Sequence, residues 1–208
     1  MEILICDDHK IVRDGLSQIL LRLKGVVEIS EAATGAEALA QLRDRVFDIV
    51  LLDISLPDRS GLEVLQVIKD KFPKTNVLIL SMHAQEQYAI RSIKLGASGY
   101  LTKDTASEEL LLAVKKVSNG GTYITQSLAE NMAHHLDSNK HQAVHDKLSP
   151  REFEIFIRLA DGKTLNDIAG ELNISNKTVS TYRSRIMIKM EFVTNSELTK
   201  YAMENNLI

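Results

Sequence analysis

Five short apolar runs alternate with five amphipathic stretches from the N-terminus to about residue 118, and this alternation constrains the fold most. Apolar residues recur every three or four positions in the amphipathic stretches, as one buried helix face requires. The run Ile49-Val50-Leu51-Leu52 is apolar throughout, which is typical of a strand buried on both faces. The alternation predicts an α/β fold with a doubly wound, five-stranded parallel sheet. We expect strands at 2–6, 26–32, 47–52, 76–80 and 99–101, and helices at 9–23, 35–45, 61–71, 86–95 and 106–118.

The regular alternation ends at Gly120-Gly121. The residues that follow are polar and rich in His and Asn, which predicts a linker at 121–147 with one helix near 127–136. Four linker histidines suggest a zinc site, but they lack partners at ligand spacing, so a solvated linker is the better interpretation. These histidines are His134, His135, His141 and His145. We therefore expect one domain at 1–120 and a second at 148–208.

Only the helical period continues after residue 148, so the second domain is expected to be small and all-α. Ser149-Pro150-Arg151-Glu152 combines a capping box with proline at the first helical position, which marks a helix start. The second and third predicted helices are separated only by Asn173-Ile174, which is helix-turn-helix spacing. We expect helices at 151–161, 164–172, 175–190 and 196–204.

Composition narrows the class of protein. No apolar run approaches the roughly 20 residues that a membrane span needs, and the N-terminus lacks the basic start and cleavage site of a signal peptide. We therefore expect a cytoplasmic protein without a membrane partner. The single cysteine, Cys6, excludes an intrachain disulfide. The net charge of −3 does not indicate nucleic-acid binding, but residues 173–190 carry four basic residues and no acid.

Polar residues follow four of the predicted strands where each strand ends. Asp7 and Asp8 follow the first strand, Asp53 the third, Ser81 the fourth, and Lys103 lies just beyond the fifth. Each alone has an ordinary interpretation as a helix cap, a turn residue or a surface lysine. The carboxyl ends of parallel strands, however, meet at the ligand-binding edge of an open sheet. Their coincidence at four strand ends therefore predicts one site.

Three carboxylates and a lysine together suit phosphoryl transfer to a carboxylate. Closely packed carboxylates raise each other's pKa, so a divalent cation is expected to keep them ionised. Mg²⁺ fits because it prefers oxygen ligands and bridges carboxylate to phosphate, and Mn²⁺ could replace it. Asp53 is the expected nucleophile, while the metal and the Lys103 ammonium neutralise charge in the transition state.

These residues resemble the receiver signature of two-component response regulators. The resemblance implies a flavodoxin-like fold with Asp53 as phosphoacceptor and a metal bound by Asp8, Asp53 and the Ser55 backbone carbonyl, with Asp7 acting through water. Lys103 and Ser81 would then stabilise the phosphoryl group. Ser81 and Tyr100 would form a switch pair in which the hydroxyl moves to the phosphoryl oxygen and the ring turns inward. The matching segments are Ile5-Cys6-Asp7-Asp8-His9, Leu51-Leu52-Asp53-Ile54-Ser55-Leu56-Pro57 with Gly61, Leu80-Ser81, and Gly99-Tyr100-Leu101-Thr102-Lys103.

The predicted helix at 175–190 has an apolar stripe and a basic face. The stripe, formed by Val179, Tyr182, Ile186 and Met190, is the expected core face. A basic helix with small hydroxyl residues suits the major groove, because cations bind phosphates while Ser and Thr contact bases. A solvated helix face is the alternative, but the tight turn before the helix favours DNA. The expected DNA-binding residues are Lys177, Thr178, Ser180, Thr181, Arg183, Ser184, Arg185 and Lys189.

The second domain resembles the LuxR-type output domain, and with the receiver it is similar to the NarL/FixJ class of response regulators. This resemblance implies that Ser180, Thr181 and Ser184 face bases and that the last helix mediates dimerisation. Glu191 departs from the family, which commonly has glycine there. A glutamate would resist a left-handed helix cap and adds negative charge near DNA. The matching segments are Leu148-Ser149-Pro150-Arg151-Glu152, Asn166-Asp167-Ile168-Ala169 and Ile174-Ser175-Asn176-Lys177-Thr178-Val179-Ser180, and the expected dimer contacts are Leu198, Tyr201 and Ala202.

The two resemblances imply a transcription regulator that is phosphorylated on Asp53 by a sensor histidine kinase, dimerises, and binds promoter DNA, with RNA polymerase as a further partner. Its only expected catalysis is its own Mg²⁺-dependent phosphorylation and dephosphorylation at Asp53. Since residues 148–208 have no net charge, one copy is expected to bind DNA weakly, and two copies are needed.

Two other functions would use parts of the same pattern. An aspartyl-phosphate phosphatase or transferase would need a second acid/base carboxylate near Asp53 and a substrate pocket, and the sequence offers neither. A receiver that serves only as a protein-interaction surface would not need the complete set of Asp7, Asp8, Asp53 and Lys103.

Overall fold

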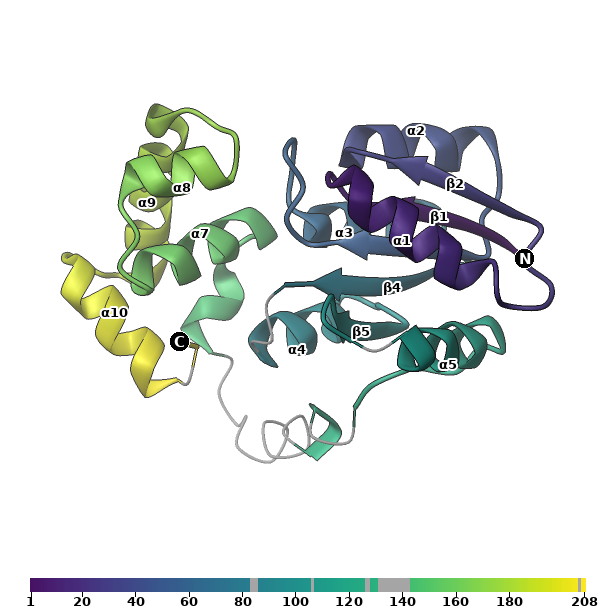
Figure 1. The fold of residues 1–208 in the computed structure, drawn as a ribbon. Helices are drawn as coiled ribbons and strands as arrows, with labels where there is room; N and C mark the ends of the chain where they lie inside the picture. The colour runs from purple at the N-terminus through teal and green to yellow at the C-terminus, as the bar shows by residue number, and fades with distance from the viewer. Residues whose placement is uncertain (83–85, 106, 126–127, 131–142, 206) are drawn as a thin grey trace. The chain divides into compact units, whose positions relative to one another are not determined.

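The computed structural model describes residues 1–82, 86–105, 107–125, 128–130, 143–205 and 207–208. The chain forms two compact units, which are described separately (Figure 1). Among the helices of these described residues, none is both long enough and apolar enough to cross a membrane.

The N-terminal unit is a five-stranded parallel sheet in the order β2-β1-β3-β4-β5. This order confirms the predicted doubly wound sheet. Side chains of α1 and α5 pack against one face together with Ile3, Ile49 and Leu78, while α2 packs on α3 at the other face. The strands are β1 (Glu2–Cys6), β2 (Glu28–Ala32), β3 (Ile49–Asp53), β4 (Asn76–Ser81) and β5 (Gly99–Thr102), and the helices are α1 (Lys10–Leu20), α2 (Gly35–Asp44), α3 (Gly61–Lys71), α4 (Glu86–Lys94) and α5 (Ser107–Ser118).

Three predicted boundaries of this unit are wrong by two or three residues. The third strand begins at Ile49 rather than at residue 47. The predicted second strand starts at residue 26, but Val27 is 79% exposed and the strand begins at Glu28. The first helix ends at Leu20 rather than at residue 23, because the backbone tightens into a turn in which the Leu23 N–H donates to the Leu20 carbonyl. At each of these boundaries, apolar residues continue the hydrophobic pattern past the end of the strand or helix.

The contacts of the N-terminal unit continue past the predicted boundary at residue 120. Tyr123 forms a parallel bridge with Gly99 at the edge of β5, and the backbone N–H of Tyr123 donates to Ser98 O at 2.8 Å. Gly99 permits this approach because a Cβ there would lie 2.6 Å from the Tyr123 carbonyl oxygen. Most of the predicted helix at 127–136 lies outside the described residues. The part that is described, residues 128–130, is helical.

The C-terminal unit is helical, as predicted, and each α-helix begins and ends within one residue of its expected boundary. Phe153 and Phe156, from the first helix of this unit, lie in the core of the unit and are 1% and 0% exposed. Ser149 and Glu152 form the predicted capping box, with the Glu152 side chain accepting from the Ser149 N–H at 2.7 Å. The elements are η1 (Val144–Lys147), α7 (Pro150–Ala160), α8 (Leu165–Glu171), α9 (Asn176–Met190) and α10 (Asn195–Glu204).

The turn between α8 and α9 has the compact geometry that the two-residue spacing predicts. Asn173 adopts a left-handed conformation with φ of 54°, which asparagine tolerates better than most residues. The Ile174 N–H then donates to Ala169 O at 3.0 Å and closes α8. Ser175 begins α9 by accepting from the Thr178 N–H at 3.0 Å.

Candidate functional site

Three charged side chains from three strand ends meet at one edge of the sheet. The Lys103 Nζ atom lies 2.6 Å from Asp7 Oδ2 and 2.8 Å from Asp53 Oδ2. The side chains of Asp7, Asp53 and Lys103 are only 2%, 4% and 8% exposed. The structure thus brings together three of the residues that the sequence predicted to converge.

Burial and charge act against each other at Asp53. Burial is the largest influence on the pKa of Asp53 and raises it, Lys103 and the Ser55 N–H lower it, and the charge of Asp7 raises it; the net result is a pKa of about 6. Burial alone would lower the pKa of Lys103, but the two carboxylates outweigh it and raise that pKa. One ammonium therefore serves two buried carboxylates, and the cluster keeps an excess of negative charge.

The third carboxylate, Asp8, lies at the rim of this cluster. Its side chain is 33% exposed, and Asp8 Oδ1 lies 2.8 Å from Nδ1 of His9. The same His9 nitrogen is 3.5 Å from Asp7 Oδ1. We call Asp7, Asp8, Asp53 and Lys103 the acidic cluster. It offers oxygen donors and surplus negative charge, and this donor set fits a hard divalent cation such as Mg²⁺.

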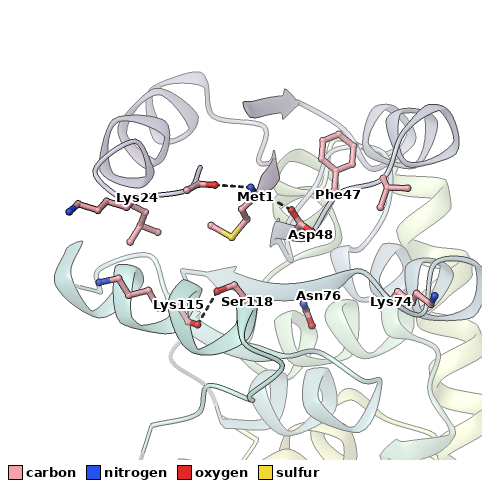
Figure 2. A pocket seen from close by; sticks show the side chains of 11 residues that line it. Met1, Lys24, Phe47, Asp48, Lys74, Asn76, Lys115 and Ser118 are labelled. Carbon is pink, nitrogen blue, oxygen red and sulfur yellow. Dashed lines mark hydrogen bonds and ion pairs between the residues drawn. The ribbon is translucent and has the colours of Figure 1, made fainter. Parts of the chain in front are cut away.

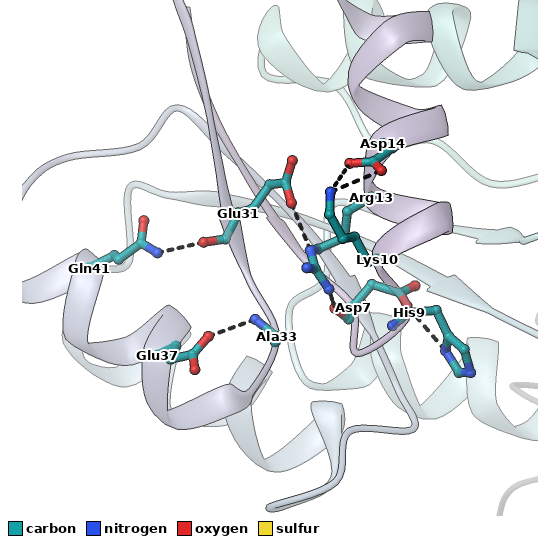
Figure 3. A network of polar contacts seen from close by, with 9 residues as sticks. All are labelled: Asp7, His9, Lys10, Arg13, Asp14, Glu31, Ala33, Glu37 and Gln41. Carbon is teal, nitrogen blue, oxygen red and sulfur yellow. Dashed lines mark hydrogen bonds and ion pairs between the residues drawn. The ribbon is translucent and has the colours of Figure 1, made fainter.

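His9 and Arg13 also contact the residues of this site, and the sequence did not predict either contact. The Arg13 guanidinium donates to the backbone carbonyl of Asp7 at 2.8 Å and to Glu31 at 2.8 Å (Figure 3). Arg13 thereby fixes the end of β1 where Asp7 begins the site. The position of His9 directly after two acids was the only sequence signal for its contact with Asp8.

Ser81 and Tyr100, the predicted switch pair, are in contact. The Tyr100 hydroxyl is hydrogen-bonded to the Ser81 side chain, and burial raises the pKa of Tyr100 to about 12. Ser81 is 1% exposed and Tyr100 is 5% exposed, so the ring already lies inward in this structure. The Lys103 N–H donates to the Ser81 carbonyl at 2.8 Å and ties this pair to the acidic cluster.

A cavity of about 630 Å³ lies at the opposite end of the strands from Asp53 (Figure 2). Lys24, Lys74 and Lys115 line it together with Phe47 and Asp48, and none of its lining residues belongs to the acidic cluster. This cavity therefore does not supply the substrate pocket that an enzyme acting at Asp53 would require.

Six of the eight residues predicted to bind DNA are exposed on α9: Lys177, Ser180, Thr181, Ser184, Arg185 and Lys189. Thr181 Oγ1 donates to the Lys177 carbonyl at 2.9 Å, and Ser184 Oγ donates to the Ser180 carbonyl at 3.1 Å. Both hydroxyl oxygens remain able to accept hydrogen bonds from a ligand.

Three predicted DNA-binding residues have partners inside the C-terminal unit. Thr178 is half-buried, and its hydroxyl shares a 2.7 Å hydrogen bond with the capping Ser175. Arg183 donates to Asn195 Oδ1 at 2.7 Å. Lys189 Nζ lies 2.6 Å from Glu152 Oε2, on a carboxylate that is 4% exposed. The sequence could not show these contacts because each partner except Ser175 comes from another helix.

The core stripe of α9 differs from the predicted one at two positions. Val179, Ile186 and Met190 are buried as expected, but Tyr182 is half-buried and Met187 is 8% exposed. The Arg185 guanidinium lies 5.9 Å from the centre of the Tyr182 ring, which is within the range of a cation–π contact.

The predicted dimer contacts are wrong for Leu198 and Ala202. Both are 0% exposed, because this face of α10 packs against α7 in the core of the same unit. Tyr201 is also engaged internally: its hydroxyl lies 2.9 Å from Nδ1 of His145 and accepts from the backbone N–H groups that begin η1. Of the four linker histidines, His134, His135 and His141 lie outside the described residues.

Glu191 ends α9 in a left-handed conformation, which glycine adopts more readily than any other residue. Its φ is 60° and its ψ is 34°, in the left-handed region. The Glu191 N–H donates to Ile188 O and the Phe192 N–H donates to Met187 O, at 3.2 and 2.9 Å. This pair of bonds is a Schellman motif formed without glycine.

Comparisons with known proteins agree with this architecture. Residues 3–115 match the response regulator receiver domain, and residues 146–202 match the bacterial regulatory proteins of the luxR family. The chain is 36% identical over 215 residues to the oxygen regulatory protein NreC of Staphylococcus haemolyticus (strain JCSC1435), covering 100% of this chain and 99% of NreC. It is 33% identical over 208 residues to the response regulator UvrY of Escherichia coli (strain K12), covering 100% of this chain and 95% of UvrY.

Among solved structures, RcsB from Salmonella enterica serovar Typhimurium, bound to promoter rprA in the presence of phosphomimetic BeF3-, aligns with a TM-score of 0.66 and 25% identity over 97% of each chain. The family matches cover both structural units, and the alignments with NreC and UvrY span the whole of this chain. The chain therefore belongs to the NarL/FixJ class of response regulators, with a receiver domain followed by a luxR-type DNA-binding domain.

Proposed function

We propose that this protein is a phosphorylation-controlled transcription regulator in which Asp53 accepts a phosphoryl group from a sensor histidine kinase. The observation that carries the proposal is the buried position of Lys103 Nζ, 2.6 Å from Asp7 and 2.8 Å from Asp53. In the transfer, the P–N bond of a phosphohistidine breaks and a P–O bond to Asp53 forms. Lys103 holds one carboxylate oxygen of Asp53 and would stay beside the new phosphoryl group to neutralise its charge.

The acidic cluster would hold Mg²⁺, with Mn²⁺ as an alternative ion. Asp8, Asp53 and the Ser55 backbone carbonyl are the proposed ligands, and Asp7 acts through water. When bound, the cation supplies positive charge to the carboxylate and phosphate oxygens, which the single ammonium of Lys103 cannot fully balance. The excess of negative charge in the buried cluster supports this assignment.

Ser81 and Tyr100 would carry the signal away from Asp53. Their hydroxyl groups are hydrogen-bonded to each other, so a Ser81 hydroxyl that turns to a phosphoryl oxygen must leave Tyr100. The Tyr100 ring would then lose its polar partner, and the surface formed by α4, β5 and α5 would change between two states. Self-catalysed dephosphorylation of Asp53 would reverse the change.

In the C-terminal domain, the exposed face of α9 would enter the major groove. Lys177 and Arg185 are proposed to bind phosphates, whereas Ser180, Thr181 and Ser184 face bases. Arg183, Lys189 and Thr178 already have partners inside the domain. They contact DNA only if each side chain reaches DNA in addition to its internal partner. Because the domain has no net charge, stable binding requires a phosphorylated homodimer. Promoter DNA and RNA polymerase are cytoplasmic partners, which assigns the protein to that compartment.

Phosphodonor labelling tests the assignment of Asp53. Wild type, Asp53→Asn and the control Asp48→Asn are incubated with acetyl phosphate and Mg²⁺, and the modified residue is mapped by mass spectrometry. Asp48 lies at the opposite end of the sheet and serves as a matched aspartate. We expect labelling of wild type and Asp48→Asn and none of Asp53→Asn. Labelling at another residue contradicts the assignment of Asp53, and no labelling of wild type favours a receiver that acts only as an interaction surface.

A further inference from the structure

The Asp58 carboxylate joins the loop after β3 to the first turn of α2. Its Oδ1 accepts from the Gly35 N–H and its Oδ2 from the Ala36 N–H, both at 2.9 Å. The first N–H groups of a helix have no partner inside the helix, and the helix dipole favours a negative charge there. Burial alone would raise the pKa of Asp58, but these two N–H groups and Arg59 hold it below the usual value.

The loop that carries Asp58 is closed at its base. Ser55 and Ser60 form an antiparallel bridge, and the Gly61 N–H donates to Ile54 O at 2.7 Å. A Cβ at Gly61 would overlap the backbone oxygen of Asp53, so this approach requires glycine. These contacts link Asp58, at the tip of the loop, to Ser55, at its base, within one closed turn of the chain.

The segment that Asp58 contacts, at the start of α2, is held beside Asp7. The Asp7 N–H donates to Ala32 O at 3.1 Å, and the Cys6 thiol contacts Thr34 O at 3.6 Å. The segment that leads into α2 therefore lies beside the end of β1. Gly35 is also packed tightly, since a Cβ there would lie 2.6 Å from Val64 Cγ2. Through these contacts, Asp58 connects the strand end that carries Asp7 to the loop that carries Ser55.

We propose that Asp58 is a positioning residue for the divalent cation, which it does not touch. It fixes the Ser55 backbone carbonyl relative to Asp7 and Asp53, so that the metal ligands lie at the right separation before the ion binds. This inference rests on the proposed metal site. Groups that orient metal ligands without binding the metal commonly change metal affinity by about 10-fold to 100-fold when removed.

Calorimetric titration with Mg²⁺ alone, on the full chain without phosphodonor, tests this role. The variants are Asp58→Ala, Asp58→Asn and the matched control Asp48→Ala. Asp48 likewise accepts a backbone N–H, from Glu2 at 2.7 Å. We expect Asp58→Ala to raise the dissociation constant for Mg²⁺ by about 10-fold. Asp58→Asn keeps one acceptor oxygen and should give a smaller increase, and it replaces the alanine variant if that protein does not fold. Asp48→Ala should bind Mg²⁺ as wild type does.

Amide hydrogen exchange at Gly35 and Ala36 separates positioning from simple helix capping. Faster exchange at these amides together with unchanged Mg²⁺ affinity in a folded Asp58 variant would overturn the inference, because Asp58 would then only cap α2. Failure of the metal site itself has a different signature. If Asp53→Ala binds Mg²⁺ as tightly as wild type, the cation is elsewhere, and both the site and the role of Asp58 are wrong.

Discussion

The Nζ atom of Lys103 lies 2.8 Å from Oδ2 of Asp53, and both side chains are less than one-tenth exposed. Removing two charges from water is costly, and a pair repays that cost only with good geometry and further partners. Here Lys103 is shared with Asp7 at 2.6 Å, so Asp53 is only partly compensated. The pKa of about 6 at Asp53 is the consequence, and it makes the receiver sensitive to substitutions and to pH.

Asp53→Asn should stabilise the metal-free receiver. The pKa of Asp53 is about 6 in the folded protein against 3.8 for a free side chain, so ionisation opposes folding. We expect the unfolding free energy to rise by about 3 kcal/mol at pH 7.5. The difference should shrink as the pH falls from 6 to 4, where wild type also becomes protonated. Amide exchange of β3 in EDTA measures both values; a destabilised Asn variant would contradict this account.

Lys103→Met should destabilise the receiver in a pH-dependent way. Two buried carboxylates lose their shared cation, at an expected cost of about 3 kcal/mol at pH 8. Without Lys103 the pKa of Asp53 lies above 6, so acidification to pH 5.5 protonates Asp53 and restores much of the loss. Amide exchange of β3 at the two pH values measures this recovery. The control Lys115→Met removes an exposed lysine at the opposite end of the sheet and should change little at either pH.

Glu191→Gly should stabilise the C-terminal domain by about 1 kcal/mol, because glycine adopts φ of 60° without steric cost. Glu191→Ala keeps the Cβ and removes the same charge, so it should bring no comparable gain. The amide exchange of α9 reports the unfolding free energy of this domain. Equal stabilisation by alanine and glycine would show that charge, rather than backbone strain, is the cause.

The cations of α9 should separate into two groups. Lys177 and Arg185 are exposed, so alanine at either position should weaken binding to all DNA sequences and reduce the salt dependence by about one ion per copy. Lys189→Ala leaves the Glu152 carboxylate without its ion pair, so it should mainly lower domain stability, by about 1 kcal/mol. Anisotropy titrations at several salt concentrations measure the first effect, and amide exchange of α9 measures the second. The grouping is wrong if Lys189→Ala changes the salt dependence as Lys177→Ala does and leaves stability unchanged.

The sequence predicted those features that depend on periodicity and on strand ends. Alternating elements placed Asp7, Asp53 and Lys103 at one sheet edge, and the structure has them in contact. Contacts between different helices could not be predicted in this way. Leu198 has the helical spacing of a core residue, but nothing in the sequence states that α7 covers it. The Lys189 contact with Glu152, across 37 residues, is hidden for the same reason.

Glu191 shows a further limit of sequence reasoning. Glutamate is a poor residue for a left-handed helix end, yet α9 ends there in that conformation. The tertiary contacts outweigh the local preference: Phe192 follows directly and its ring centre lies 5.5 Å from that of Tyr201. A single unfavourable residue can be held in place by the packing of its neighbours.

Binding to DNA in four phosphorylation conditions tests the central claim most directly. Wild type and Asp53→Asn are each titrated, with and without acetyl phosphate and Mg²⁺, onto a duplex selected from a random pool with phosphorylated wild type. We expect phosphorylated wild type to bind about 10-fold or more tightly than the other three samples, as a phosphorylation-dependent dimer requires. Equal affinity in all four conditions would contradict the claim that phosphorylation of Asp53 controls DNA binding.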